Sequence, residues 1–281
     1  MERGGLAALR VFNPHPKTAA LDAHAATLRE AFAVNPPHTV QEAVDRIEAV
    51  TGIRRSPTQV REWLKKNGFS RRKTGQIPAK ADPVAQQLFL DTQLTPVLAE
   101  AQAGRRHVFF VDAAHFVLGA WLGYLWCLTR ILLPTPSGRQ RFNVLGALHA
   151  VTHAVITVTS DTYINSDSVV TLLKNLAERF TDLPITLVLD NARYQRNVYV
   201  MSEAERLGIT LLWLPTYSPN LNLIERLWKF VKADCLHGRY YPKFAPFKQA
   251  IIDCLAETDG RHKAKLNTLL TLNFQVFKSS A

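Results

Sequence analysis

The chain has 281 residues, of which 47% are hydrophobic and 20% are charged. This length allows one large domain with a small companion or two medium domains, and the hydrophobic content excludes a disordered chain. Lysine and arginine number 34 against 23 acidic residues, a net charge of +11. A charge of this size indicates a polyanionic partner such as nucleic acid if the cations are clustered, and a merely solvated basic surface if they are scattered.

The cysteines and the apolar stretches predict a cytoplasmic protein without a membrane partner. Cys127, Cys235 and Cys254 lack the spacing of a Cys-x-x-Cys metal site, so we interpret them as reduced thiols. The N-terminus lacks the pattern of a signal peptide. The most apolar stretch, residues 116–129, is shorter than the roughly 20 residues of a membrane-spanning helix.

Helical signals begin after an N-terminal segment, residues 1–23, that has the composition of a loop. Thr39 has the spacing of a helix N-cap, and Gly52 is placed to end that helix. Ser56 and Pro57 then open another helix. Three short helices with a tight turn before the last predict a helix-turn-helix domain, of winged-helix-like type, over residues 24–73.

The last of these helices and its flanks hold many of the cations of the chain. Eight lysines and arginines lie in residues 54–73, opposed only by Glu62. Because the charge coincides with the helix-turn-helix pattern, DNA binding is favoured over a helical dimerisation domain with a solvated basic face. The expected DNA contacts are Arg54, Arg55, Gln59, Arg61, Lys65, Lys66, Arg71, Arg72 and Lys73.

The remaining chain is expected to form a linker with a connecting helix, residues 74–104, and a larger domain, residues 105–281. In the larger domain strand-like runs come first, and strands then alternate with helices. The expected strands are 108–111, two within 116–133, 142–148, 154–159, 185–189 and 209–214, and the expected helices are 166–180, 194–207 and 223–235. This order predicts an α/β fold with a mixed sheet flanked by helices on both faces.

Two of the apolar strands end in aspartate, at Asp112 and Asp190. Functional groups gather at strand ends in open α/β sheets. If the strands are neighbours, the two carboxylates lie about 4.8 Å apart, near enough to bridge a pair of metal ions. Either aspartate alone is also typical of a turn. Acids without a nearby cysteine–histidine cluster favour Mg²⁺ or Mn²⁺ over zinc.

A third acid, Glu225, lies in the first turn of an amphipathic helix that follows a polar turn, in the run LPTYSPNLNLIERLWKF of residues 214–230. Asn222 and Glu225 have the spacing of an N-cap residue and the third residue of its helix. Glu225 therefore has two possible roles at this point, a helix cap and a member of a site with the two aspartates.

Three blocks of the sequence resemble DDE-type insertion-sequence transposases of the mariner-like superfamily, which have an RNase H-like catalytic fold. The blocks are HVFFVDAAHF (107–116), LVLDNARYQ (187–195) and LPTYSPNLNLIERLW (214–228). The 34 residues between the second and third acids are typical of that superfamily. With the helix-turn-helix, the resemblance covers about residues 24–277. The chain departs from the family pattern at Ala113, Gln195, Asn220 and Leu223, none of which is an expected metal ligand.

The resemblance implies that Asp112, Asp190 and Glu225 hold two Mg²⁺ ions, which Mn²⁺ can replace, and that these residues are catalytic. It implies cleavage and strand transfer of double-stranded DNA, at the ends of the element and in target DNA, by a homodimer associated with a bacterial nucleoid. By their position in the blocks, His115, Asn191 and Asn222 are expected to support the site.

Two alternatives remain open on the sequence. A different RNase H-like nuclease would share the acids without needing a helix-turn-helix. A truncated, non-catalytic DNA-binding relic would repress by occupying the ends of the element. The relic is favoured by one feature, because only the second of the two helix-turn-helix units usual in the family is found.

Overall fold

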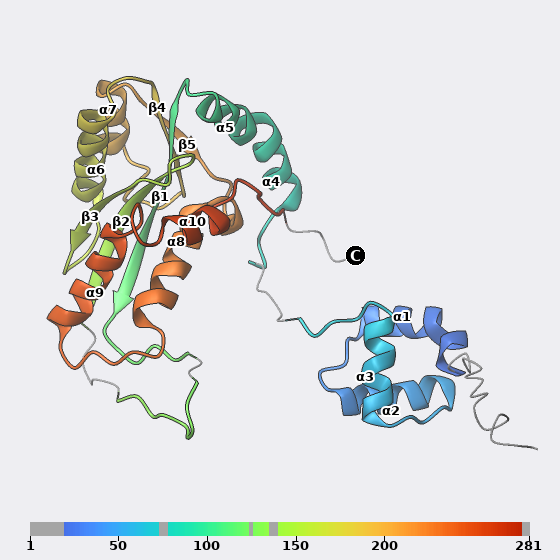
Figure 1. The fold of residues 1–281 in the computed structure, drawn as a ribbon. Helices are drawn as coiled ribbons and strands as arrows, with labels where there is room; N and C mark the ends of the chain where they lie inside the picture. Colours follow the sequence, from blue (N-terminus) through green and yellow to red (C-terminus); the bar gives the residue numbers. More distant parts are fainter. Residues whose placement is uncertain (1–19, 73–77, 124–125, 135–139, 277–281) are drawn as a thin grey trace, which may run out of the picture. The chain divides into compact units, whose positions relative to one another are not determined.

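A computed structural model describes residues 20–72, 78–123, 126–134 and 140–276 of the chain. Lys73, one of the expected DNA contacts, lies outside the described residues. The chain divides into two compact units, Met1–Gln76 and Ile77–Ala281, both of which are drawn in Figure 1. None of the helices in the described part of the chain has the length and hydrophobicity needed to cross a bilayer.

The first unit consists of helices around a small core. A 3-10 turn, η2 (Ala20–His24), leads into α1 (Ala25–Val34), and α2 (Val40–Thr51) and α3 (Pro57–Lys66) follow. Leu21 is only 2% exposed and belongs to the core of this unit. The helix-turn-helix therefore begins before the predicted residue 24, because the core needs Leu21. Residues 20–72 contain no strand, so the expected wing has no counterpart among them.

Local signals in the sequence explain where α2 and α3 begin and end. Thr39 accepts a hydrogen bond from the backbone N–H of Glu42 at 3.1 Å, and Gly52 ends α2 in the left-handed conformation, with φ of 72°. Ser56 and Gln59 form a reciprocal capping box at the start of α3. The turn between α2 and α3 is thus defined by short-range contacts.

The second unit is built on a five-stranded sheet with the order β3-β2-β1-β4-β5. The strands are β1 (His107–Val117), β2 (Arg141–His149), β3 (Val155–Ser160), β4 (Ile185–Leu189) and β5 (Ile209–Trp213). The first three pair in antiparallel fashion, whereas β4 runs parallel to β1 and β5 parallel to β4. The mixed sheet expected from the sequence is confirmed.

The prediction of two additional strands within residues 116–133 is wrong. Residues 116 and 117 are the end of β1, which continues past its last pair with β4 because it still pairs with β2. The described residues 118–123 and 126–134 contain no strand. Their apolar side chains are mostly exposed, for example Trp126 and Leu128, so the apolar run does not indicate a buried strand.

Helices cover both faces of the sheet (Figure 1). On one face, α6 (Ser166–Arg179) and α7 (Val198–Arg206) pack against a core that includes Phe109 and Leu187. On the other lie α8 (Ile224–Val231), its π-helical continuation η5 (Lys232–Leu236), α9 (Phe244–Ala256) and α10 (Lys263–Leu269), around a core that includes Phe110 and Val188. Because side chains alternate along a strand, the residues two positions after Phe110 and Val188 belong to the α8 face.

The helix that follows the predicted linker is part of the second unit. As expected, residues 83–102 are helical, in the sequence α4 (Pro83–Phe89), η3 (Leu90–Leu94) and α5 (Thr95–Gln102). Phe89 and Leu94 are buried in the larger core. Gln86 is also buried, and its Oε1 accepts a hydrogen bond from Asn220 at 2.9 Å. The predicted boundary at residue 104 therefore moves to about residue 77.

Candidate active site

The parallel pairing of β1 and β4 brings the two aspartates level with each other. Phe110 pairs with Val188, and Asp112 and Asp190 each lie two residues further along their strands. The expectation that both acids end their strands holds only for Asp190, since Asp112 lies within β1 opposite Gly146 of β2. Beyond Phe110 that side of β1 has no further pair with β4, which leaves room beside the two carboxylates.

Glu225 reaches the same place from α8, which packs on the face of the sheet to which Asp112 and Asp190 belong. After β5 the chain turns through η4 (Pro219–Leu221) and enters α8, where Glu225 lies in the first turn. Leu223 and Ile224 are fully buried and fix the start of this helix on the sheet. A cavity of about 300 Å³ is lined by all three acids, by Asn191 and Asn222, and by residues 214–219 of the turn.

The contacts of Asn222 and Glu225 exclude the helix-cap alternative. Asn222 Nδ2 donates to the Val111 carbonyl at 3.1 Å, and α8 has no side-chain cap. Among the described residues, none donates a hydrogen bond to the Glu225 carboxylate. Glu225 therefore lines the cavity, with a carboxylate that no described residue pairs, rather than closing the end of its own helix.

The three carboxylates repel one another in a partly buried site. Burial, followed by the charges of Glu225 and Asp190, raises the pKa of Asp112 to about 7. Burial also raises the pKa of Asp190. Of the described residues that line the cavity, none is a lysine or arginine. The protein thus gathers negative charge here without a neutralising side chain, an arrangement that a bound cation would stabilise.

The donor atoms of this site fit a hard divalent cation. Carboxylate and amide oxygens are the ligands that Mg²⁺ and Mn²⁺ prefer. Asn222 Oδ1 is buried at the cavity and has no hydrogen-bond partner, so a further oxygen is available. Asn191 is already engaged, since its Nδ2 donates to the Leu214 carbonyl at 2.6 Å and its Oδ1 accepts from Arg196 at 2.8 Å. Asn191 therefore ties the ends of β4 and β5 together beside Asp190.

Trp228 is a functional residue that the sequence did not predict, because its indole contacts Asp112. Trp228 Nε1 donates to Asp112 Oδ2 at 3.0 Å. A Cβ on Gly146 would lie 2.7 Å from the Trp228 ring, so this glycine makes room for the indole. The available signals were the helical spacing of three residues from Glu225 to Trp228 and a glycine inside a strand pattern.

His115 does not support the site as expected. It lies three residues after Asp112 on a strand whose side chains alternate, and therefore on the opposite face of the sheet. Its Nδ1 is 2.7 Å from Asn143 Oδ1 on β2, and His115 is not among the residues that line the cavity. The nearness of His115 to Asp112 in the sequence suggested a role that strand geometry does not allow.

The expected DNA contacts in the first unit differ in their exposure and in the hydrogen bonds that their side chains already make. Arg61, Arg71 and Arg72 are exposed, whereas Arg55 is half-buried and donates to the Arg54 carbonyl at 3.0 Å. Gln59 is exposed but already serves in the capping box of α3. Within residues 20–72, the exposed cations among the expected contacts thus lie mainly along and after α3.

Three of the expected contacts form ion pairs within the first unit. Arg54 pairs with Glu48, Lys65 pairs with Glu62 at 3.2 Å, and Lys66 pairs with Asp22 at 2.8 Å. All three cations are on exposed side chains, where such pairs contribute little to stability. A polyanion can therefore replace the acidic partners of these three cations with little loss of folding stability.

Two families match the chain. Residues 107–248 match a family described as DDE superfamily endonuclease, about half of the chain and all three acids. Residues 36–93 match a family described as winged helix-turn helix. A curated relative is the insertion element IS630 uncharacterized 39 kDa protein of Shigella sonnei, 27% identical over 188 residues. That match covers 66% of this chain and 54% of the relative, so the chain spans about half the length of the relative.

Solved structures of similar fold include complexes of Mos1 transposase. The Mos1 transposase paired-end complex with left transposon end has a TM-score of 0.56 at 12% identity, over 89% of this chain and 80% of that chain. The mariner Mos1 paired end complex with Mg has a TM-score of 0.56 at 12% identity, over 90% and 80% of the two chains. At such low identity the likeness concerns the fold, and it confirms the expected fold class.

The family match contains the three blocks on which the resemblance rests, and the fold places their acids around one cavity. The chain belongs to the DDE superfamily of endonucleases.

Proposed function

We propose that this protein is a transposase that cleaves DNA at the ends of its insertion element and joins the freed ends to target DNA. The observation that carries this proposal is the convergence of Asp112, Asp190 and Glu225 on one cavity, from two neighbouring strands and a helix distant in the sequence. Membership of the DDE endonuclease superfamily supports the cleavage of DNA, and the helix-turn-helix match supports its binding.

The catalytic and metal-binding residues in this proposal are Asp112, Asp190 and Glu225, which would hold two Mg²⁺ ions or Mn²⁺ in their place. Similar folds are described as Mos1 complexes with Mg and with Mn. When bound, such ions lower the pKa of an attacking hydroxyl and offset charge on the phosphodiester. Asn222 Oδ1 is proposed as an additional oxygen near the ions because it has no other partner.

The surrounding residues position the acids. Trp228 holds one oxygen of Asp112, and the backbone N–H of Ala192 donates to Asp190 Oδ1 at 3.1 Å. Asn191 fixes the turn after β4. With a pKa of about 7, the Asp112 carboxyl carries a proton for part of the time at neutral pH, and it releases that proton when it serves as a ligand. The site is thus prepared by the fold and completed by cations.

The proposed DNA partner binds both units. The cations along and after α3 would contact the phosphates of the element ends, and the acids would act on the bond to be cut. We further propose that two copies act together, because an element has two ends; similar structures are described as paired-end complexes of Mos1. The expected location is the bacterial nucleoid, where element and target DNA lie.

Nicking of DNA that carries the element ends tests the proposal. The wild-type protein is expected to nick only with Mg²⁺ or Mn²⁺, and Asp190→Ala is expected to reduce nicking to the level seen without metal. Asp182→Ala is the control, because this exposed aspartate precedes the same strand at its other end. Equal nicking by wild type and Asp190→Ala would sink the enzymatic proposal. Nicking without strand transfer would favour another RNase H-like nuclease.

A further inference from the structure

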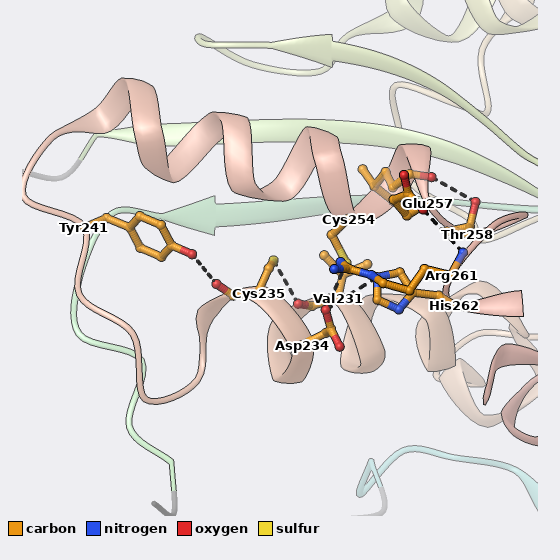
Figure 2. Close-up of polar contacts among 10 residues, drawn as sticks. Val231, Asp234, Cys235, Tyr241, Cys254, Glu257, Thr258, Arg261 and His262 are labelled. Atoms are coloured by element: carbon orange, nitrogen blue, oxygen red, sulfur yellow. Dashed lines mark hydrogen bonds and ion pairs between the residues drawn. The ribbon is translucent and has the colours of Figure 1, made fainter. Parts of the chain in front are cut away.

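A second cluster of ligating side chains lies in the second unit, outside the lining of the acid cavity. It consists of Asp234 from η5, Cys254 from α9 and His262 from the turn before α10. One ligand atom from each of the three side chains lies within 4.8 Å of the others. Figure 2 shows the three side chains pointing toward one another from these separate elements.

The fold holds these side chains in place and mostly away from solvent. Cys254 is 2% exposed and His262 is 6% exposed. The His262 ring packs edge-on against Phe230, with 5.0 Å between ring centroids, and the backbone N–H of His262 donates to the Glu257 carbonyl at 3.1 Å. Asp234 lies in a π-helical turn that continues α8 without a break. Such turns inside helices often occur at functional sites.

The spacing of the ligand atoms is close to that around a tetrahedral ion. Bonds of about 2.1 Å to nitrogen and oxygen and about 2.3 Å to sulfur place ligand atoms about 3.4–3.6 Å apart. In the structure Asp234 Oδ2 lies 3.5 Å from His262 Nε2 and 3.9 Å from Cys254 Sγ. These two separations are therefore within a few tenths of an ångström of the values around an ion.

The types of ligand indicate which metal the cluster would take. A thiolate, an imidazole and a carboxylate together suit zinc, whereas the acid cavity offers only oxygen. A separate cavity of about 430 Å³ is lined by Asp234, Cys254 and Cys235. This cavity gives an ion a route from solvent and leaves space for water as a fourth ligand.

We propose that Asp234, Cys254 and His262 form a binding site for Zn²⁺ that is distinct from the catalytic acids. On binding, the Cys254 thiol loses its proton to solvent and a sulfur–zinc bond forms, with no change of oxidation state. The ion would link η5, α9 and the turn before α10. Since η5 continues the helix that carries Glu225, the metal anchors the far end of that helix.

The rival explanation is a hydrogen-bonded network without metal. Arg261 Nη2 lies 3.1 Å from His262 Nε2, and His262 in turn lies near Asp234. Zinc requires the same lone pair of Nε2, so Arg261 must turn toward the adjoining cavity, which it already lines. The two explanations therefore predict different effects of removing Arg261. Metal binding becomes tighter if there is a metal site, whereas the protein loses a hydrogen bond and gains no metal binding if there is none.

Titration of the full-length protein with Co²⁺ tests the proposal, because a cobalt–thiolate bond gives a charge-transfer absorption that carboxylates do not. The wild type is expected to show this band at one equivalent and to lose it when Zn²⁺ is added. Cys254→Ser should abolish the band, His262→Gln should weaken Co²⁺ binding at least about tenfold, and Arg261→Met should strengthen it. Cys127→Ser is the matched control, since Cys127 is exposed.

Circular dichroism of each variant shows whether it folds. If Cys254→Ser does not fold, Arg261→Met still tests the proposal, because it keeps all three proposed ligands. Absence of a thiolate band in the wild type would overturn the proposal, as would a band that Cys254→Ser leaves unchanged. Repeating the titration with Asp190→Asn separates this site from the catalytic one. That variant is expected to lose nicking and to retain the band, so either proposal can fail without the other.

Discussion

At the residue scale, burial and two neighbouring carboxylates disfavour the ionised form of Asp112 in the candidate active site, whereas hydrogen bonds favour it. Its carboxylate is partly buried beside Glu225 and Asp190, and burial is the main reason that its pKa is raised to about 7. Hydrogen bonds from the Ala113 backbone and from the Trp228 indole lower the pKa and offset part of this cost. The side-chain donor to Asp112 is thus an indole on a helix that is far away in the sequence.

We expect Trp228→Phe to lower metal-dependent nicking by about 10–100-fold while the protein stays folded. Phenylalanine keeps most of the ring volume and removes the donor to Asp112 Oδ2, so Asp112 loses its orientation. Trp121→Phe is the matched control, because the Trp121 indole donates to the Val117 carbonyl at 3.2 Å instead. Nicking rates measured over a range of Mg²⁺ concentrations check this, and equal rates for both variants would refute the positioning role.

Without divalent metal, we expect stability to fall as pH rises toward 7. The pKa of Asp112 is about 7 in the fold against 3.8 ordinarily, so the folded protein binds the proton more tightly than the unfolded chain. This contribution is fully present below pH 3.8 and is lost as pH rises through about 7. The loss is on the order of a few kcal/mol.

Urea unfolding in a chelating buffer at pH 5 and pH 8 measures this effect. Asp112→Asn should lose less stability between the two pH values than the wild type, since the amide does not titrate and does not repel Glu225 and Asp190. Added Mg²⁺ should restore the stability of the wild type at pH 8. The proposed dependence of stability on the protonation of Asp112 is wrong if the stabilities of Asp112→Asn and the wild type change equally with pH.

At the scale of elements, the contact between β2 and α8 sets the position of the helix that carries Glu225. Gly146 of β2 lies opposite Asp112 and beneath Trp228, where a Cβ would come within 2.7 Å of the indole. A strand normally gains from replacing glycine, because glycine is flexible when unfolded. Here the close approach of strand and helix reverses that preference.

We expect Gly146→Ala to destabilise the second unit by about 1–3 kcal/mol, as overpacking usually does, and to reduce nicking because Trp228 is displaced from Asp112. Gly119→Ala is the control, since the nearest atom to its added Cβ is 4.0 Å away. Chemical denaturation gives both values. A Gly146→Ala protein that is as stable and active as the wild type would contradict the packing argument.

Helix α3 gives a second prediction at this scale. Arg61 and Lys65 are exposed on α3, and each is expected to contact DNA phosphate. Arg61→Ala or Lys65→Ala should weaken binding and lower the slope of log affinity against log salt by about 1. Arg29→Ala on α1 is the control, because Arg29 is equally exposed on another helix. Unchanged affinity in both α3 variants would remove α3 from the interface.

The boundaries of elements followed from the sequence where short-range chemistry sets them. The caps at Thr39 and Ser56 and the turn at Gly52 were readable because a cap involves residues only a few positions apart. The full length of β1 was not readable, since its last residues are ordered by β2 rather than by a pattern of their own. The same holds for His115, whose face of the sheet depends on where β1 continues.

At the scale of the whole molecule, the two units have separate hydrophobic cores. The first unit is built around residues such as Leu28 and Ile47, and the cores of the second are formed by its own strands and helices. In the proposed function the catalytic metal would therefore bind the second unit alone, whereas DNA would contact both units. Cooperative unfolding is expected within each unit rather than across the chain.

Calorimetry is expected to show two transitions. Mg²⁺ should raise the melting temperature of the second unit alone, because the acids belong to it and a ligand stabilises only the state that it binds. Ile47→Ala should destabilise the other transition by about 2–5 kcal/mol and leave the Mg²⁺-dependent one unchanged. Leu187→Ala is the matched core variant of the second unit. One transition that both variants lower together would contradict this division.

The sequence by itself determined the family, the mixed sheet, the helix-turn-helix and the identity of the three acids, because these depend on motifs and periodic patterns within short stretches of chain. Only the tertiary structure decided that Trp228 holds Asp112, that His115 faces away, and that Asp234, Cys254 and His262 meet. Those contacts join residues from separate strands and helices. They arise from the packing of whole elements against a common core, which no local pattern encodes.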